Sequence, residues 1–353
     1  MHIITCEQVS DGHPDKICDQ IADAVVTDCL RHDEKSRVAI ECLIKNDHLI
    51  IAGELTSKHN PSYSELVRNV FERIGTKRLG YRWEDIKIQT LVQRQSPDIA
   101  MGVDLGGAGD QGMMYGYATN ETLQLLPIPY VLARDFLVLL KEHPYEGFKA
   151  DAKAQVSFDY DSWRITTFLC SVQHSPDIAV KDIRPAIEAM MHSVALKRGF
   201  NADFEMLVNP TGRFTIGGPF ADCGVTGRKL ACDTYGGVGR IGGGALSGKD
   251  PTKVDRSGAY MARKVACDIV SHGYADKAEV QIAYAIGVAK PVSVYVDCFN
   301  TETKSINAIN QYVLATYDMT PQGIIDSLGL RTVDYNEVSA YGHFGKEKMP
   351  WEQ

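Results

Sequence analysis

The sequence predicts an α+β fold made of three similar units. Two observations support this prediction: three stretches alternate like β-hairpins, and each lies between two stretches of helical periodicity. The order helix, hairpin, helix recurs at intervals of roughly one third of the chain, as an internal repeat would. Coincidence is the weaker explanation for three matching orders. We therefore expect repeated units whose sheets bury their apolar faces against helices.

The hairpins are the clearest part of each unit. The first is expected over residues 37–55, with alternating apolar residues from Val38 to Ile44 and a turn at Asn46-Asp47. The other two are expected over residues 155–173 and 279–299. The flanking helices are expected over residues 15–30, 63–74, 130–140, 180–196, 257–270 and 305–317.

Three segments between the predicted elements are rich in Gly, Asp, Lys and Arg and have little hydrophobic periodicity. They span residues 7–16, 93–116 and 209–256. We predict loops there. Because functional residues lie on loops more often than in cores, we expect these three segments to carry the chemistry.

The composition is that of a globular protein large enough for two or three domains. The chain has 353 residues, 44% of them apolar and 23% charged, with a formal net charge of −8. An acidic chain is a poor general binder of nucleic acid, because phosphate backbones require a basic face. We expect domains over residues 1–98, 108–216 and 217–352.

Neither export nor membrane insertion is indicated. No apolar run has the length of a membrane span, and the residues from Met1 to Glu7 lack the basic and apolar regions of a signal peptide. The nine cysteines are scattered without a C-x-x-C pair, which favours reduced thiols and argues against a zinc site. We therefore expect a cytoplasmic protein.

Two glycine-rich stretches look like nucleotide-binding motifs but lack parts of them. Residues 237–242 fit G-x-G-x-x-G, yet Gly243 and Gly244 follow, so the helix of a dinucleotide-binding fold does not readily start there. Residues 243–249 fit most of a P-loop, but Asp250 replaces the Ser or Thr that would bind magnesium. We reject both motifs, although bare backbone and a lysine still suit a phosphate group.

The third segment, residues 209–256, combines cations, carboxylates and clustered glycines. Its cations are Arg213, Arg228, Lys229, Arg240, Lys249, Lys253 and Arg256, and its interleaved carboxylates are Asp222, Asp233, Asp250 and Asp255. A solvated charged surface would also contain such residues, but the glycines permit close approach of backbone to a ligand. Cations for phosphate oxygens and carboxylates for Mg²⁺ suit a metal-bound polyphosphate.

The first and second segments offer further polar groups. Pro14 fits the first turn of a helix, so His13 and Asp15 would lie at the positive end of the helix dipole, which favours anions. Each also has an ordinary explanation, Asp15 as a helix-start carboxylate and His13 as a surface residue. The second segment, around residues 95–112, either closes over a site as a lid or is a plain surface loop.

Several long motifs occur in the order typical of one enzyme family. They are Gly12-His13-Pro14-Asp15-Lys16, Gly107-Ala108-Gly109-Asp110-Gln111-Gly112, Asp151-Ala152-Lys153, Asn209-Pro210-Thr211-Gly212-Arg213-Phe214, Gly227-Arg228-Lys229, Gly243-Gly244-Ala245, Lys249-Asp250-Pro251 and Ala340-Tyr341-Gly342-His343-Phe344-Gly345. From end to end the chain resembles S-adenosylmethionine synthetase (methionine adenosyltransferase).

The resemblance implies three similar α+β domains about a pseudo-threefold axis, in agreement with the repeat. It implies a homodimer or a dimer of dimers (a homotetramer), with active sites between subunits. The implied reaction transfers the adenosyl group of ATP to the sulfur of L-methionine, by in-line attack on C5′, and then hydrolyses the bound triphosphate to pyrophosphate and phosphate. Two Mg²⁺ ions per site and K⁺ are the implied cofactors.

The resemblance also assigns roles to residues at matching positions. The implied catalytic residues are His13, Lys153, Arg228 and Lys249. The implied ATP-binding residues are His13, Asp151, Lys153, Arg213, Phe214, Asp222, Arg228, Lys229, Ala245 and Lys249. Methionine would be held by Glu54, Gln95, Asp222 and Lys253, with Asp110 near the substrates. Asp15 and Asp255 would each bind Mg²⁺, and Glu41 would bind K⁺.

One stretch departs from the family pattern. Between Gln95 and Gly107 the chain is shorter than many bacterial members, which concerns the length and closing rate of the lid but not the chemistry. From the residues themselves, two other hypotheses stay open. In the first, the chain is a different ATP-dependent enzyme, such as a kinase or ligase. In the second, it is a non-enzymatic repeat protein whose glycine loops only connect domains.

Overall fold

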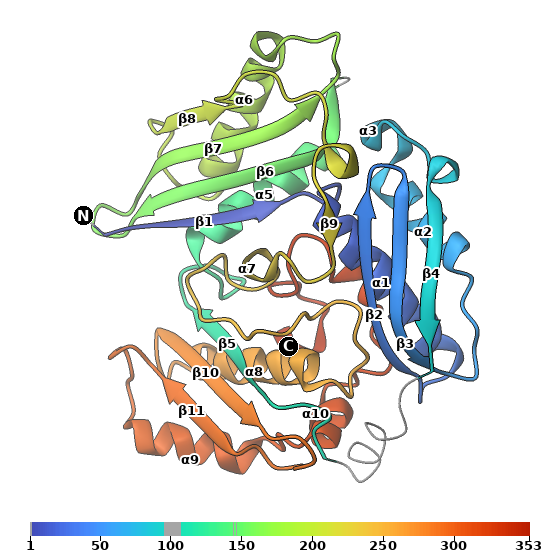
Figure 1. Ribbon diagram of the computed structural model, residues 1–353. Helices are drawn as coiled ribbons and strands as arrows, with labels where there is room; N and C mark the ends of the chain where they lie inside the picture. The colour runs from blue at the N-terminus through green and yellow to red at the C-terminus, as the bar shows by residue number, and fades with distance from the viewer. Residues whose placement is uncertain (1, 95–106, 144, 146) are drawn as a thin grey trace.

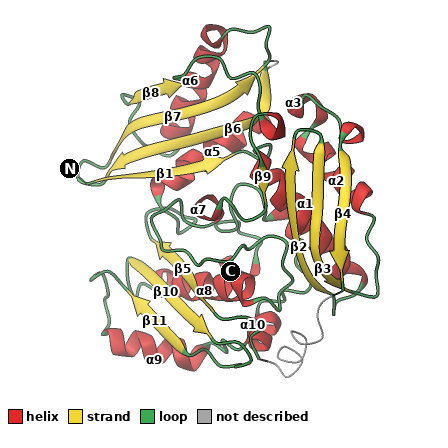
Figure 2. Cartoon of the chain, viewed as in Figure 1, coloured by secondary structure: helices red, strands yellow, loops and turns green. Residues whose placement is uncertain are grey.

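A computed structural model describes residues 2–94, 107–143, 145 and 147–353. These residues form three sheets, each with helices packed on one face, and the three sheets surround a central region (Figure 1). Helices and strands alternate along the chain as an α+β protein requires, and the long loops run between the sheets (Figure 2). The predicted fold class is therefore confirmed.

The predicted order of helix, hairpin and helix occurs three times. The N-terminal unit consists of α1 (Pro14–His32), β2 (Arg37–Lys45), β3 (His48–Thr56), α2 (Tyr63–Ile74), α3 (Thr76–Leu79), η1 (Trp83–Asp85) and β4 (Lys87–Gln93). The central unit consists of α5 (Ile128–Glu142), β6 (Phe148–Asp159), β7 (Arg164–His174), α6 (Val180–Lys197) and β8 (Glu205–Val208). The C-terminal unit consists of α8 (Val254–Ser271), β10 (Lys277–Tyr284), β11 (Ser293–Asp297), α9 (Ile306–Thr316), α10 (Pro321–Ser327), η3 (Tyr335–Glu337) and η4 (Pro350–Glu352).

The three segments predicted to be loops contain several short strands and helices. The prediction of loops was wrong for these parts of the segments. The additional elements are β1 (Ile3–Val9), β5 (Gly112–Thr119), η2 (Gly218–Phe220), β9 (Gly224–Val225) and α7 (Leu230–Asp233). Residues 7–9 belong to β1, residues 112–116 belong to β5, and α8 already begins at Val254. Such strands have little periodicity of their own, because long-range pairing with another strand decides their conformation.

Each sheet contains the hairpin of one unit and one antiparallel strand from a different part of the chain. The strand orders are β4-β3-β2-β9, β8-β7-β6-β1 and β11-β10-β5. The first hairpin strand pairs with the incoming strand in every sheet: β2 with β9, β6 with β1, and β10 with β5. Equivalent places in the three sheets support the threefold repeat. The boundaries at 1–98, 108–216 and 217–352 stay a prediction, because the sheets exchange strands across them.

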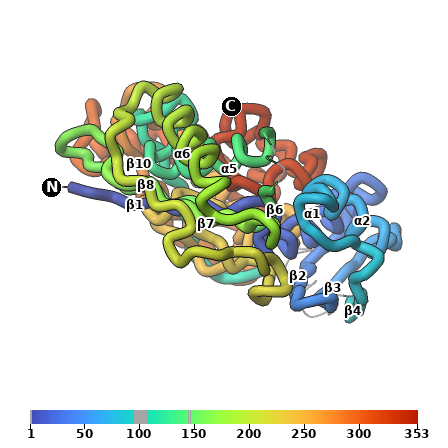
Figure 3. Tube along the Cα trace, turned by 90° about the horizontal axis from the view of Figure 1, so that it is seen from above, coloured from blue at the N-terminus to red at the C-terminus, as the bar shows by residue number. Residues whose placement is uncertain are grey.

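Helix α1 is buried on nearly all sides. Sixteen of its 19 residues are buried, so the helix lies inside the molecule rather than on its surface. The molecule has two hydrophobic cores. One runs through the N- and C-terminal units and contains the fully buried Ile17 and Val265, and the other fills the central unit around Phe136. From above, β2, β3 and β4 lie at the end of the molecule opposite to the N-terminus (Figure 3). Polar residues inside α1 must find partners, because unpaired buried charges are costly.

The cysteines and helices also bear on the sequence predictions. All nine cysteines are free thiols in the structure, and eight of them are buried. Over the described part of the chain, no helix combines the length and apolar character needed to cross a bilayer.

Candidate active site

The start of helix α1 positions His13 and Asp15. Pro14 is the first helical residue and His13 is the N-cap, with an extended backbone at φ −63° and ψ 137°. The Nδ1 atom of His13 accepts a hydrogen bond from the backbone N–H of Asp15 at 3.2 Å. The His13 side chain is buried, not a surface residue. The imidazole is thereby fixed at the positive end of the helix dipole.

The environment of His13 keeps its imidazole neutral. Burial, followed by the positive charges of Lys229 and Lys153, lowers the pKa of His13 to about 3. Because Nδ1 accepts a hydrogen bond, the proton of the neutral ring is on Nε2. His13 can therefore donate one hydrogen bond from Nε2 to an anionic ligand at the helix start, without acting as a cation.

Three carboxylates on α1 hold the glycine-rich loops in place. Asp15, Asp19 and Asp23 follow one another at intervals of four residues, so they lie along one side of the helix. They accept hydrogen bonds from the backbone N–H groups of Val225, Gly227 and Gly248, at 2.8, 2.8 and 2.9 Å, respectively. We call these three residues the carboxylate row. It fixes two loops that are distant in sequence against one buried helix.

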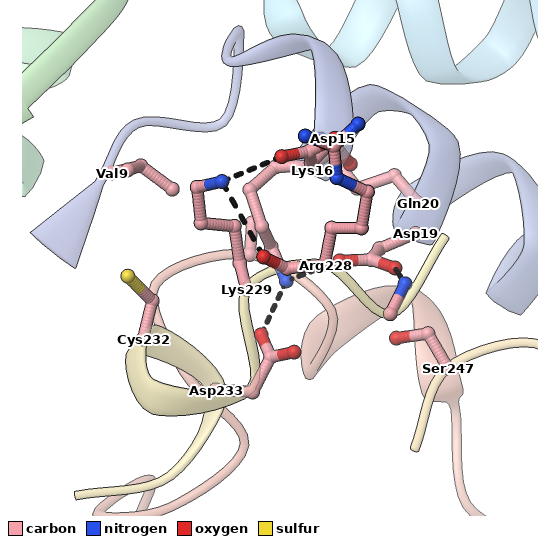
Figure 4. A network of polar contacts seen from close by, with 12 residues as sticks. Val9, Asp15, Lys16, Asp19, Gln20, Arg228, Lys229, Cys232, Asp233 and Ser247 are labelled. Atoms are coloured by element: carbon pink, nitrogen blue, oxygen red, sulfur yellow. Dashed lines mark hydrogen bonds and ion pairs between the residues drawn. The ribbon is translucent and has the colours of Figure 1, made fainter. Parts of the chain in front are cut away.

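Each member of the carboxylate row also pairs with a cation. Lys229 Nζ lies 2.6 Å from the Oδ2 atom of Asp15, as Figure 4 shows. Asp19 pairs with the fully buried Lys16 at 2.9 Å, and Lys16 also pairs with Asp233. Asp23 accepts two hydrogen bonds, of 2.6 and 2.8 Å, from the buried guanidinium of Arg256 on α8. These pairs compensate charges that would otherwise be uncompensated inside the protein.

The second of the two glycine-rich loops, which contains Lys249, lies along the edge of β2. Ile40 N–H donates to Gly248 O and Asp250 N–H donates to Val38 O, both within 3.0 Å, so residues 248–250 run alongside β2 on the side where β9 pairs. Lys249 is then held with its ammonium 2.6 Å from Asp255 Oδ2, at the start of α8. As the sequence predicted, residues 243–249 do not form a P-loop. The carboxylate of Asp250, which stands where a P-loop has Ser or Thr, accepts hydrogen bonds from Val38 N–H and from Lys253.

The two loops meet between these cation–carboxylate pairs. A Cβ placed on Gly227 would lie 2.5 Å from the Cβ of Ala245, so the Gly227-Arg228-Lys229 turn touches the Gly243–Ala245 stretch. Arg228 is exposed, and its side chain lies beside this turn (Figure 4). The structure thus brings together the cationic loops that the sequence predicted, although they are separated along the chain.

Strand β6 adds the central unit to the site. Lys153 is opposite Val9 in the β1–β6 register, and its charge acts on His13. Asp151 accepts a hydrogen bond from Gly218 N–H at 2.8 Å, and burial raises the pKa of Asp151 to about 6. Asp222 is exposed, and its negative charge acts on both His13 and Asp151.

The outer face of the β2–β3–β4 sheet carries two more of the predicted residues. Glu54 is directly opposite Ala39, which in turn is opposite Lys249 in an antiparallel bridge. Directly opposite residues share one face of a sheet, and strands are about 5 Å apart, so Glu54 and Lys249 share a face roughly 10 Å apart. Glu41 lies on the same face, exposed, and has no hydrogen-bond or ion-pair partner among the described residues.

The remaining predicted residues lie at the margin of this cluster. Phe214 is fixed by two hydrogen bonds to His174, at the end of β7, and Arg213 beside it is exposed. Asp110 is exposed and accepts a hydrogen bond from the neighbouring Gln111 N–H. No contact in the described residues joins these three to the loops at α1. Gln95 and most of the predicted lid lie outside the described residues.

Sequence reasoning missed the lower part of the carboxylate row. Asp19 and Asp23 were not predicted as site residues, although both fix a glycine-rich loop through a backbone N–H group. The available signal was the spacing of four residues from Asp15 on a helix whose other residues are mostly apolar. Charges on the buried side of a helix have a partner or a function.

The carboxylates of Asp15 and Asp255 fit a divalent cation. Mg²⁺ prefers oxygen ligands and is often held by one or two carboxylates together with phosphate oxygens. Both carboxylates already attract a cation, because each accepts a 2.6 Å hydrogen bond from a lysine. Gly244 presents bare backbone to Asp255, since a Cβ at this position would lie 2.1 Å from Asp255 Oδ1.

The fold and this cluster of cations and carboxylates fit a class of proteins: three-unit α+β enzymes whose cationic loops and carboxylates suit a metal-bound polyphosphate. The family models for the N-terminal, central and C-terminal domains of S-adenosylmethionine synthetase match residues 1–97, 105–214 and 216–353. The chain belongs to the S-adenosylmethionine synthetase family.

Individual relatives agree with the family models over nearly the whole chain. A protein of Mycoplasma mycoides named S-adenosylmethionine synthase is 42% identical over 99% of this chain and 94% of its own length. Proteins of the same name from Sorangium cellulosum and Mesoplasma florum are each 43% identical over 99% of this chain, and over 87% and 97% of their own lengths.

Family membership decides between the hypotheses that the sequence left open. The protein is a methionine adenosyltransferase, which makes S-adenosylmethionine from ATP and methionine, and its family needs metal ions. A non-enzymatic repeat protein and a kinase or ligase are therefore excluded.

Proposed function

We propose that ATP binds where the cationic loops meet the start of α1, and that adenosyl transfer takes place there. The observation that carries this proposal is the convergence of His13, Lys229 and Lys249 from distant segments onto loops fixed to α1 and β2. Both lysines are paired with carboxylates, so a bound triphosphate would exchange one anionic partner for another. Preorganised cations of this kind stabilise a leaving group.

The triphosphate would be held by the cations around this junction. Four cations serve this role in our proposal: Lys153, Arg228, Lys229 and Lys249. The Nε2–H group of His13 would donate a hydrogen bond to the triphosphate. Asp151 and Asp222 border the same cluster, and we assign them to contacts with the nucleotide's uncharged polar groups, because like charges would repel the phosphates.

We place the adenosine of ATP toward the central unit. Ala245 borders the Gly227 turn, so it can contact a nucleotide whose phosphates lie on that turn. Phe214 offers an aromatic face for adenine and Arg213 a planar cation beside it. The hydrogen bonds between Phe214 and His174 support this assignment, because they fix the backbone of the segment.

We place methionine on the outer face of the β2–β3–β4 sheet. Glu54 would attract the methionine ammonium, and its shared face with Lys249 supports this role, since the sulfur must reach the nucleotide. Asp222 and Lys253 would complete the amino-acid site, with Asp110 near the substrates. Gln95 is assigned to methionine by family resemblance alone.

The metal site follows from the carboxylates. Asp15 and Asp255 would each hold a Mg²⁺ ion, and Glu41, an exposed carboxylate on the same sheet face as Glu54, would hold K⁺. When bound, the Mg²⁺ ions supply positive charge that neutralises the triphosphate. Lys229 and Lys249 would then move from the carboxylates to phosphate oxygens.

The reaction needs orientation and charge stabilisation more than proton transfer. The thioether sulfur of methionine attacks C5′ of ATP in line with the bond to the triphosphate, which breaks as the sulfur–carbon bond forms. The sulfur has no proton to lose, so no general base is required. Lys249, Lys229 and the Nε2–H of His13 stabilise the negative charge that develops on the leaving oxygen. The same cations would then assist hydrolysis of the bound triphosphate to pyrophosphate and phosphate.

We also propose that the protein is a cytoplasmic homodimer, or a dimer of dimers, with active sites between subunits. The supporting observation is that the proposed methionine face of the β2–β3–β4 sheet is open. It carries exposed apolar residues, Leu43 and Leu91, in the same face as Glu41 and Glu54. A second copy on this face would cover the apolar residues and enclose the substrate.

A product assay with a magnesium titration tests the site. The enzyme is incubated with ATP, L-methionine, K⁺ and increasing Mg²⁺, and the products are identified by mass. We expect S-adenosylmethionine, phosphate and pyrophosphate, and an Asp15→Asn variant that needs more Mg²⁺ for half-maximal rate. Asp177→Asn, an exposed carboxylate on the central unit, serves as the control. An Asp15→Asn titration that superimposes on that of Asp177→Asn would remove Asp15 from the metal site.

A further inference from the structure

A cavity lies beside α1, at a junction of the three units. It has a volume of about 350 Å³. Gln20 of α1, Arg73 of α2, and Arg134 and Lys141 of α5 line it, together with six residues of the C-terminal segment between positions 336 and 346. None of the proposed ATP, methionine or metal-binding residues is among its lining residues in the described chain.

The cavity has an excess of positive charge. Its lining cations are Arg73, Arg134, Lys141 and Lys346, and Arg78 lies next to it. The exposed carboxylate of Glu337 lines the cavity, and the fully buried Asp11 pairs with Lys141 and Arg78. Among the described residues, four cations and one carboxylate therefore line the cavity. A concave surface of one sign of charge attracts a ligand of the opposite sign.

Two of these cations are not matched by a close carboxylate. The Arg134 side chain is 9% exposed, and Asp135, its ion-pair partner, lies 3.8 Å away and already pairs with Arg198 at 2.5 Å. Arg73 has no ion pair in the described part of the chain, and its one hydrogen bond goes to the neutral amide of Asn336. Neither cation has a carboxylate within 3.5 Å in the described part of the chain, although the charges of Asp334, Asp11 and Asp23 act on Arg73.

Lys346 is in the same situation. Its ammonium donates to three backbone carbonyls, those of Glu337, Val338 and Ala340, and to no carboxylate among the residues that the structure describes. Burial lowers the pKa of Lys346 to about 7. A nearby anion would favour the charged form and raise that pKa.

The C-terminal motif Ala340 to Gly345, which has no part in the proposed chemistry, shapes this cavity. Ala340, Tyr341 and Gly345 line it. Tyr341 has a positive φ of 59°, and Gly342 and Gly345 have φ values of 85° and 74°. This left-handed backbone is unfavourable for a residue such as Tyr341, so the surrounding contacts hold the motif in its shape.

We propose that this cavity binds a small polyanion carrying phosphate groups, at a site distinct from the ATP site. The same cations link the cavity to the start of α1. Lys141 Nζ lies 2.7 Å from Asp11 Oδ2, and Arg78 also pairs with Asp11, two residues before His13. A ligand that takes Lys141 would release one of the contacts that hold the His13 segment. Occupancy would therefore change the affinity of the ATP site as well.

Inorganic pyrophosphate is the probe, titrated calorimetrically without Mg²⁺ and at low salt. The wild-type protein should show two classes of site. Lys249→Ala should weaken only the class at the proposed ATP site. Arg73→Glu should weaken the other class by roughly tenfold, because charge complementarity at the rim is reversed. Arg68→Glu, on the same helix α2 but outside the cavity, makes the same charge change and should leave both classes intact.

Arg73→Gln provides a second variant with a smaller charge change, and circular dichroism checks that each variant is folded. The proposal is overturned if Arg73→Glu binds pyrophosphate like Arg68→Glu. It is also overturned if the wild type has one class of site and Lys249→Ala abolishes that binding. That outcome leaves the proposed ATP site standing, so the two proposals fail separately.

Discussion

Lys249 is the side chain whose removal we expect to affect the reaction most. It is held 2.6 Å from Asp255 by the backbone of residues 248–250, so its charge is preorganised near the proposed leaving group. We predict that Lys249→Ala lowers kcat by roughly 10²- to 10³-fold, the effect of removing one preorganised stabilising group. Lys290→Ala, an exposed lysine in the C-terminal unit, is the control. Steady-state kinetics with near-normal kcat in Lys249→Ala would exclude this residue.

His13 links the site to the stability of the fold. Its pKa is about 3 in the folded protein and about 6.5 when exposed, so the unfolded chain binds more protons between these values. The contribution of the neutral ring to stability is complete above pH 6.5 and is lost as the pH falls toward 3. Between pH 7 and pH 5 we predict a loss of about 2 kcal/mol in the free energy of unfolding that His13→Asn does not show.

Urea unfolding of both proteins at pH 7 and pH 5 measures this difference. The other titrating groups are common to wild type and variant, so their contributions cancel in the comparison. Equal pH dependence of the two proteins would mean that the pKa of His13 is the same in the folded and unfolded states.

For single residues, the sequence predicts the side chains that belong to motifs but not those that fix the backbone of the loops. His13, Asp15, Lys229 and Lys249 are predicted from motifs, and they are brought together at one junction. Asp19 was missed because its function is to accept a backbone N–H group of a distant loop. Such a contact leaves no local pattern, since the donor is the backbone of Gly227 and not a recognisable side chain.

Among the elements, helix α1 organises the site. A helix buried on nearly all sides would normally be apolar all round. Here the buried helix contains the carboxylate row. Because burial holds each carboxylate rigidly, each backbone N–H group of the loops has a hydrogen-bond acceptor at a fixed position. The positions of the cationic loops are therefore fixed by hydrogen bonds to one helix, α1.

Asp23 tests this role of α1. Its carboxylate compensates the buried Arg256 and accepts a hydrogen bond from Gly248 N–H. We predict that Asp23→Ala lowers the free energy of unfolding by about 3–5 kcal/mol, because it leaves an uncompensated buried charge. The Gly248 loop would also lose its anchor, so the KM for ATP should rise. Thermal or urea unfolding and steady-state kinetics measure both effects.

Glu34→Ala is the matched control for Asp23→Ala. Its side chain is exposed just beyond the end of α1, and surface substitutions of this kind change stability by about 0.5 kcal/mol or less. An Asp23→Ala protein as stable as Glu34→Ala would contradict the view that α1 anchors the loops through its carboxylates.

The sequence predicts elements well where their pattern is local. Helices α1 and α2 and the hairpin of β2 and β3 agree with the expected ranges to within a few residues. Strands β1, β5 and β9 were missed for a common reason. Each pairs with a strand from another unit, so its conformation depends on contacts that no window of sequence contains.

For the whole molecule, these exchanged strands turn three similar units into one body. Each joins one unit to another; β1 and β9 lead directly into the loops of the site, and β5 follows the loop that contains Asp110. A site assembled from all three units therefore depends on the complete chain. The internal repeat is visible in sequence, whereas the exchange that assembles the site is not.

The open face of the β2–β3–β4 sheet yields the last prediction. Leu91 on β4 is 56% exposed and is directly opposite Ala52, which is opposite Glu41, so an apolar position adjoins the proposed K⁺ and methionine residues. If a second copy covers this face, Leu91→Glu places a charge in an apolar interface. We predict that this variant is monomeric and has lost most of its activity, because both active sites lose their partner.

Light scattering coupled to gel filtration measures the mass, and the product assay measures activity on the same fractions. Leu196→Glu is the matched control, since Leu196 is 60% exposed at the end of α6, in a different unit. It should keep the wild-type mass and activity. A Leu91→Glu protein that keeps the wild-type mass would show that this sheet face is not the subunit interface. A wild-type protein that is itself a fully active monomer would contradict active sites between subunits altogether.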